Sequence, residues 1–142
     1  MVFYYESSNG PYSAQVEHVL HILNGKYLKG LEQMNVKPFE PIELKYDKAK
    51  EVSEYVRKNL SDKQIQILKN LINLIDSFQS PLSLEILATI DFIRLEIPDA
   101  NKDDIIRIIK NWSYRKQEHF DEKYIDIALE HLDEYKSQLQ FV

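Results

Sequence analysis

Apolar residues recur at helical spacing in six successive stretches of this chain, and a capping signal opens each of them. The first helix is expected to start between Pro11 and Ser13 and to stop at Asn24-Gly25. The later starts are marked by Asp47, by Ser61 with Gln64 three residues on, by Ser80-Pro81, and by Asp99 or Asn101. Asp121 and Glu122 open the last helix, where acidic residues suit the positive end of the helix dipole. This succession predicts a mainly α fold of about six helices.

The stretch from Leu82 to Ile97 is apolar on most sides, so we expect it to form the central, most buried helix. Two later stretches carry narrower apolar stripes that should face the same core. These stripes are Ile105, Ile108, Ile109 and Trp112, and then Ile125, Ala128, Leu129, Leu132 and Leu139. Residues 113–119 between them are basic and polar, and we expect a connection there.

A short β component is expected near the N-terminus. Val2–Tyr5 is β-branched and aromatic, which favours a strand. Its natural mate is the region 38–44, where two prolines forbid a helix but permit an edge strand. With 142 residues, the chain suffices for one domain spanning residues 1–142. The predicted class is therefore a mainly α, single compact domain of about six helices with at most a short two-stranded β ribbon.

The composition excludes several classes of function. The chain has no cysteine, which removes disulfides, thiolate catalysis and cysteine-ligated zinc. Its formal charge of −5 argues against a general nucleic-acid binder. No apolar run approaches the roughly 20 residues of a membrane span, and no leader peptide opens the chain. We therefore expect a cytoplasmic protein without a membrane partner.

The sequence offers no convergent set of residues for catalysis or metal binding. His18 and His21 lack the further ligand that a metal site would show. The three glycines match neither a dinucleotide-binding nor a Walker spacing, and no serine lies between glycines in a nucleophile elbow. Adjacent carboxylates such as Asp103 and Asp104 point about 100° apart on a helix. We expect no catalytic residue, no metal and no cofactor.

The helices between Ser61 and Trp112 leave a second class of function open. They could form a helix-turn-helix of a DNA-binding transcriptional regulator, with the helix from Asn101 in the recognition position. The exposed side of that helix mixes basic residues with Asp103 and Asp104. Aspartates at a helix start repel phosphate, so nucleic acid is the less favoured partner.

The last helix carries the most suggestive surface. Carboxylates recur there at steps of three and four residues, at Glu122, Asp126, Glu130 and Asp133 or Glu134. Carboxylates four residues apart on a helix stand about 6 Å apart along its axis, close to the spacing of phosphates on an extended nucleic-acid strand. This acidic column is either a solvated helix face or a mimic of a polyanion.

A series of motifs runs along the chain: Tyr4-Tyr5, Asn9-Gly10-Pro11-Tyr12-Ser13, Leu23 to Gly30, Ser77 to Thr89, Trp112, and Arg115-Lys116. Their order resembles the C-terminal domain of the macrodomain antitoxins of the DarG type, which are encoded beside the DarT toxin. The resemblance covers nearly the whole chain. The structural motif residues within it are Gly10, Pro11, Tyr12, Gly25, Gly30 and Trp112.

The resemblance implies toxin neutralisation by contact. In that family this domain binds an ADP-ribosyltransferase that acts on thymidine in single-stranded DNA, and it usually follows an ADP-ribose-hydrolysing macrodomain. This chain has no macrodomain, so we expect a non-enzymatic interaction domain, either a truncated homologue or an excised piece. Its expected partner is a DarT-like toxin with a basic groove. The residues expected to bind it are Glu122, Asp126, Glu130, Asp133 and Glu134, with Tyr114 and Tyr124 as anchors.

Overall fold

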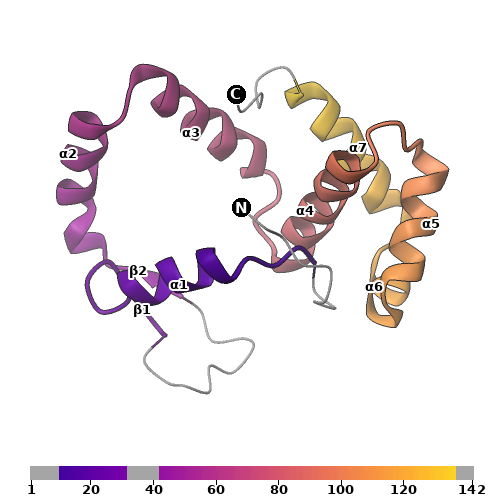
Figure 1. The fold of residues 1–142 in the computed structure, drawn as a ribbon, viewed down its shortest axis with the longest axis horizontal. Helices are drawn as coiled ribbons and strands as arrows, with labels where there is room; N and C mark the ends of the chain where they lie inside the picture. The colour runs from indigo at the N-terminus through magenta and orange to yellow at the C-terminus, as the bar shows by residue number, and fades with distance from the viewer. Residues whose placement is uncertain (1–9, 32–41, 137–142) are drawn as a thin grey trace. The chain divides into compact units, whose positions relative to one another are not determined.

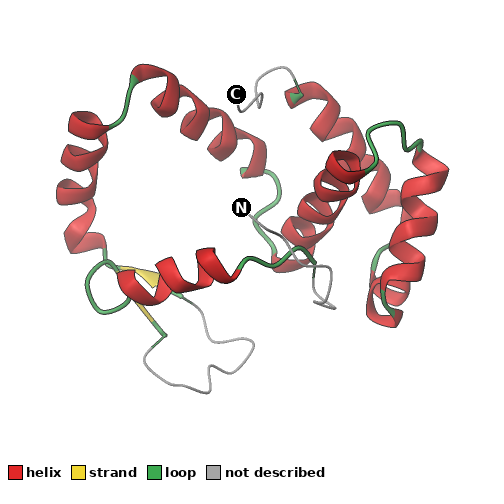
Figure 2. Cartoon of the chain, in the orientation of Figure 1, coloured by secondary structure: helices red, strands yellow, loops and turns green. Residues whose placement is uncertain are grey.

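The computed structural model describes residues 10–31 and 42–136. The elements follow in the order α1 (Ala14–Leu23), β1 (Leu28–Lys29), β2 (Glu43–Leu44), the 3-10 helix η1 (Tyr46–Lys48), α2 (Ala49–Asn59), α3 (Asp62–Ile75), α4 (Pro81–Glu96), α5 (Lys102–Trp112), α6 (Tyr114–His119) and α7 (Glu122–Tyr135) (Figure 1, Figure 2). The predicted mainly α class with a short two-stranded sheet is confirmed.

Contacts between residues divide the described chain into two units. The N-terminal unit comprises residues 13–31 and 42–65, and the C-terminal unit comprises residues 10–12 and 66–136. That residues 1–142 form one domain stays a prediction.

Side-chain caps explain where most helices begin. Ser13 caps α1, Ser80 caps α4 with Pro81 in the first turn, and Asp121 caps α7. Of the two candidates before α5, Asn101 is the cap. Ser61 and Gln64 exchange hydrogen bonds at the start of α3, as the spacing predicted. The prediction for Asp47 is wrong, because Asp47 lies inside η1 and α2 follows directly without a side-chain cap.

The two strands pair antiparallel, with Leu28 opposite Leu44 and Lys29 opposite Glu43. Lys29 Nζ and Glu43 Oε2 lie 2.6 Å apart across this pair. The sequence predicted only a bend at Leu28, whereas the structure pairs Leu28–Lys29 with β2, which corrects that expectation. The strand predicted at Val2–Tyr5, and residues 38–41 of its expected mate, lie outside the described residues.

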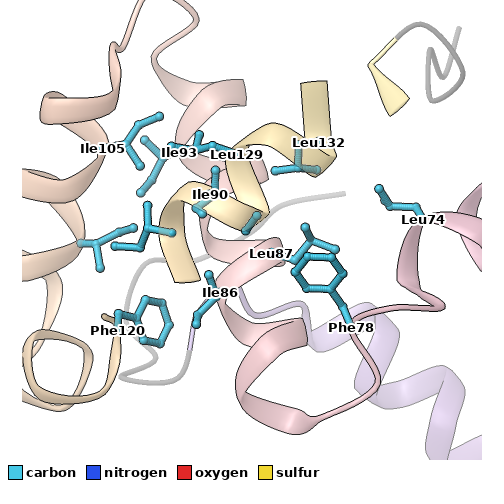
Figure 3. Close-up of a cluster of buried hydrophobic side chains, with 13 residues drawn as sticks. Leu74, Phe78, Ile86, Leu87, Ile90, Ile93, Ile105, Phe120, Leu129 and Leu132 are labelled. Atoms are coloured by element: carbon cyan, nitrogen blue, oxygen red, sulfur yellow. The ribbon is translucent and has the colours of Figure 1, made fainter. Parts of the chain in front are cut away.

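The core of the C-terminal unit is built around α4, which packs against α7 and α5 (Figure 3). Six α4 residues are buried, and Ile90 is fully enclosed. The central position predicted for this helix is therefore confirmed. The predicted inward residues are buried at Ile105, Ile109, Ile125, Ala128, Leu129 and Leu132, while Ile108 and Trp112 are partly buried and Leu139 lies outside the described residues.

Residues 113–119 correct another expectation. They form α6 rather than an irregular connection, because Ser113 caps the turn by accepting a hydrogen bond from the Lys116 amide. Lys116 of this short helix is fully buried. Within the described ranges, no helix is long and apolar enough to cross a bilayer.

Candidate partner-binding site

The acidic column of the last helix forms one flank of α7. The buried side chains of Ile125, Ala128 and Leu132 form the face of α7 that packs against the core. At about 100° per residue, this orientation places Glu122, Asp126, Glu130 and Asp133 beside the helices that neighbour α7. A groove of about 400 Å³ runs along this flank, and its lining includes Arg94, Lys102, Asp126, Glu130 and Asp133.

Three acids of the column are paired with cations of α4 and α5. Arg94 binds Asp133 through two hydrogen bonds of 2.9 and 3.3 Å. Lys102 Nζ lies 2.7 Å from Asp126 Oδ1, and this contact with the carboxylate raises the pKa of Lys102. Lys110 pairs with Glu122. These pairs reduce the negative charge that the column presents, which the sequence pattern of α7 alone did not indicate.

Glu130 and Glu134 are the carboxylates of α7 that stay most available. Both are exposed, and Glu130 has no ion pair among the described residues. Glu134 Oε2 lies 4.0 Å from His131 Nδ1. The C-terminal unit nevertheless stays acidic, with nine basic and fourteen acidic residues.

Tyr124 lies on the opposite flank of α7, away from the paired acids. With Ile127 and His131 it lines a second groove, of about 470 Å³, whose other wall is Phe78, Leu82 and Ile86. Tyr124 and Ile127 are 52% and 46% exposed, so this groove presents apolar surface. Sequence reasoning selected Tyr124 but missed the groove, although the apolar Ile127 on the polar side of α7 was a signal for it.

His131 is a lining residue of this second groove with several further contacts. Its Nε2 lies 2.7 Å from the carbonyl oxygen of Leu74, and its ring packs against Phe78 and Tyr135 at centroid distances of 4.8 and 5.0 Å. These contacts hold the imidazole in one orientation. His131 therefore joins the end of α3 to α7.

Tyr114 occupies a different helix, α6. It is 74% exposed, and its hydroxyl donates a 2.6 Å hydrogen bond to Glu118, which raises the pKa of Tyr114. The structure places it in neither of the two grooves beside α7. Tyr114 and Tyr124 are therefore separate surface aromatics rather than one anchor cluster.

Several motif residues converge on a buried polar cluster. Lys116 Nζ donates hydrogen bonds to Glu85 Oε1 at 2.7 Å and to Thr89 Oγ1 at 3.2 Å. The same Glu85 oxygen accepts a 2.6 Å hydrogen bond from Arg115. The Lys116 ammonium also lies 4.5 Å from the centre of the Phe120 ring. These contacts tie α6 to α4.

The electrostatics of this cluster follow from its burial. Burial lowers the pKa of Lys116, although the hydrogen bond to Glu85 acts in the opposite direction. Burial alone would raise the pKa of Glu85, but hydrogen bonds from Arg115 and Lys116 hold it below its ordinary value. A buried ammonium with this set of partners is typical of a structural ion pair.

Gly10 brings the first motif against the same cluster. Its φ is +128°, a conformation that L side chains rarely adopt. A Cβ at this position would lie 3.5 Å from Thr89 Oγ1 and 3.9 Å from Lys116 Nζ. Pro11 and Tyr12 follow Gly10 in the chain before α1. The centre of the Trp112 ring lies 5.4 Å from Lys116 Nζ. The other two motif glycines, Gly25 and Gly30, have positive φ and belong to the N-terminal unit.

The basic residues of α5 are engaged with carboxylates. Lys102 and Lys110 pair with α7, and Arg107 pairs with Asp104 of the same helix at 2.6 Å. An α5 that served as a recognition helix would need these cations for phosphates. In the parts of the chain that the structure describes, no group of three or more histidine and carboxylate side chains could hold a metal ion.

Comparison with known proteins gives a distant similarity. No family model matches the chain. Two curated relatives, both called DNA ADP-ribosyl glycohydrolase, come from Mycobacterium bovis (strain BCG / Pasteur 1173P2) and Mycobacterium tuberculosis (strain ATCC 25618 / H37Rv). Each is 21% identical over 126 residues, which cover 87% of this chain and 36% of the relative. The chain thus spans about a third of the length of these relatives.

Proposed function

We propose that this chain is a toxin-binding domain of the DarG type, which neutralises a DNA-modifying ADP-ribosyltransferase by direct contact. The observation that carries this proposal is the similarity to the two glycohydrolases, which extends over most of the chain. A similarity of this extent favours descent of the whole helical domain over a shared local motif. Motif residues from three segments, Gly10, Glu85 and Lys116, meet in one buried cluster. This shared structural role supports the same relationship.

Binding, rather than hydrolysis, fits the chemistry of the described residues. A glycohydrolase needs an acid or base that faces its substrate. Here the charged groups mostly face one another: Lys116 is enclosed by Glu85 and Thr89, and acids of α7 pair with neighbouring helices. About two thirds of each relative lies outside the matched region, which is room for a separate catalytic domain. We therefore assign contact, and not catalysis, to this chain.

We place the contact on α7, where an acidic edge adjoins an apolar groove. Glu130 and Glu134 supply exposed negative charge, and Tyr124 with Ile127 supplies apolar surface. Charge complementarity to a basic toxin groove would mainly speed association, whereas buried aromatic and apolar anchors would supply affinity. The paired acids Glu122, Asp126 and Asp133 fix the helix that presents these groups.

A charge-reversal pair tests this proposal. The variant Glu130→Lys/Glu134→Lys should weaken binding to a DarT-like toxin by about tenfold or more, mostly through slower association, because it changes available charge and breaks no Lys or Arg ion pair. The matched control is Glu96→Lys/Asp99→Lys, an equal change in charge at the end of α4. Surface plasmon resonance at two salt concentrations would measure both.

Four outcomes separate the possibilities. Loss of binding only in the α7 variant supports the proposed contact. Equal binding by both variants and the unmodified chain overturns the contact on α7, and failure of the unmodified chain to bind overturns toxin neutralisation. Retardation of duplex DNA that falls steeply with added salt would instead favour the helix-turn-helix regulator.

A further inference from the structure

The N-terminal unit contains an open groove that the proposed contact on α7 does not use. Its volume is about 690 Å³, within the range of binding grooves in proteins. The end of α1, the β1–β2 pair, η1 and the first half of α2 surround it, and Figure 1 shows α1, β1, β2 and the start of α2 in this part of the chain. Its lining residues are Leu23, Tyr27, Leu28, Leu44, Lys45, Tyr46, Lys48, Ala49, Val52, Ser53 and Tyr55.

The apolar side chains of this unit are left largely uncovered. Neither α1 nor α2 contains a buried residue, whereas α4 contains six. Around the groove, Leu44 and Tyr55 are 60% and 64% exposed. Exposed apolar side chains that gather around a concavity, rather than being scattered singly, mark a binding surface.

The charge around the groove indicates what would cover it. Among the described residues, Lys45 and Lys48 are the charged residues of the lining. Lys45 donates to the carbonyl oxygen of Gly25, and Lys48 lies 3.2 Å from Glu51, so both ammonium groups keep further donors free. The described residues of the N-terminal unit include eight basic and six acidic residues, against nine and fourteen among those of the C-terminal unit.

From these observations we infer that the groove is a docking site for an acidic amphipathic segment of a partner protein. Apolar side chains of the segment, at helical spacing, would fill the groove between Leu44 and Val52, and its carboxylates would reach Lys45 and Lys48. A basic segment would instead place its cations against Lys45 and Lys48. The inference rests on the proposed function only for the identity of the partner, because the groove chemistry stands without it.

A matched pair of synthetic peptides tests the chemistry without the toxin. One is a helix of about 14 residues with leucine at helical spacing and glutamate elsewhere, and the other has lysine in place of each glutamate. Because the chain has no cysteine, Lys50→Cys at the side of α2 can be labelled with an environment-sensitive fluorophore. We expect the glutamate peptide to bind at least about tenfold more tightly than the lysine peptide, as read from this label.

Two substitutions locate the binding. Val52→Glu places a negative charge in the groove and should abolish the response to the glutamate peptide. The control Ile72→Glu changes another exposed apolar residue, on α3 outside the groove lining, and should leave the response unchanged. Circular dichroism would establish that both variants keep the helical content of the unmodified chain.

The inference is overturned if both peptides bind equally, if neither binds, or if Val52→Glu has no effect. A concentration-dependent dimer that Val52→Glu dissociates, seen by sedimentation velocity, would assign the groove to a second copy of this chain and also overturn it. None of these results depends on the charge-reversal test at Glu130 and Glu134, so the groove and the toxin contact stand or fall separately.

Discussion

Lys116 shows how a single charged residue can hold this fold together. It is fully buried and joins α6 to Glu85 and Thr89 of α4. Lys116→Met should lower the free energy of unfolding by about 3 kcal/mol, since it breaks a buried pair and leaves Glu85 with Arg115 alone. Urea denaturation followed by circular dichroism would measure this loss.

The exposed Lys123 provides the control for that substitution. Lys123→Met removes the same charge from the surface of α7 and should change the free energy of unfolding by about 0.5 kcal/mol or less. A structural role for Lys116 is contradicted if Lys116→Met is as mild as this control.

The carboxyl of Glu85 predicts a dependence of stability on acid pH. Its pKa is held below the ordinary value of 4.5 in the folded state, because hydrogen bonds from Arg115 and Lys116 outweigh the effect of burial. Its contribution is therefore complete above the unfolded pKa and is lost as the pH falls through the lower, folded pKa. The stability difference between the unmodified chain and Glu85→Gln should shrink from about pH 5 to about pH 2.

Thermal melts at several pH values would test this dependence. A matched variant, Glu96→Gln, replaces an exposed acid at the end of α4 and should leave the acid profile close to that of the unmodified chain. If Glu85→Gln keeps the same stability deficit at all pH values, Glu85 does not titrate as proposed.

At the scale of elements, the sequence predicted the parts that local chemistry determines. Ser61, Ser80 and Asp121 begin helices as expected, because a cap needs only amides two or three residues away. Asp47 fails as a cap because the chain leaves β2 in a 3-10 turn. The pairing of β1 with β2 was missed, since it joins residues that are distant in sequence.

The two units should respond differently to the loss of an apolar side chain. Ile90 of α4 is fully buried, so Ile90→Ala should cost about 2–5 kcal/mol of unfolding free energy. Val52 of α2 is 43% exposed at the groove, so Val52→Ala should cost about 0.5 kcal/mol or less. Denaturant titrations of both variants would measure the difference. Equal costs would mean that the groove face is packed in the free protein.

At the scale of the molecule, the sequence located the acidic helix but not its surroundings. Helical periodicity alone places Glu122, Asp126 and Asp133 on one flank of α7. Periodicity could not identify their partners Lys110, Lys102 and Arg94. These residues lie on α4 and α5, which come close to α7 only because the helices pack on a common core. Both grooves were missed for the same reason, since each is lined by several elements.

The overall charge pattern follows from these two halves. Among the described residues, the C-terminal unit has nine basic and fourteen acidic residues, and we propose that it meets a basic surface through Glu130 and Glu134. The described residues of the N-terminal unit include eight basic and six acidic residues, and its groove is the site that we infer for an acidic segment.

The most direct test of contact inhibition is a titration of a DarT-like toxin with this chain, followed by the ADP-ribosylation of thymidine in single-stranded DNA. We predict that modification stops when the chain and the toxin are equimolar, while ADP-ribose already attached to DNA stays in place when the chain is added alone. Removal of ADP-ribose from such modified DNA, or continued modification at excess chain, would contradict the account.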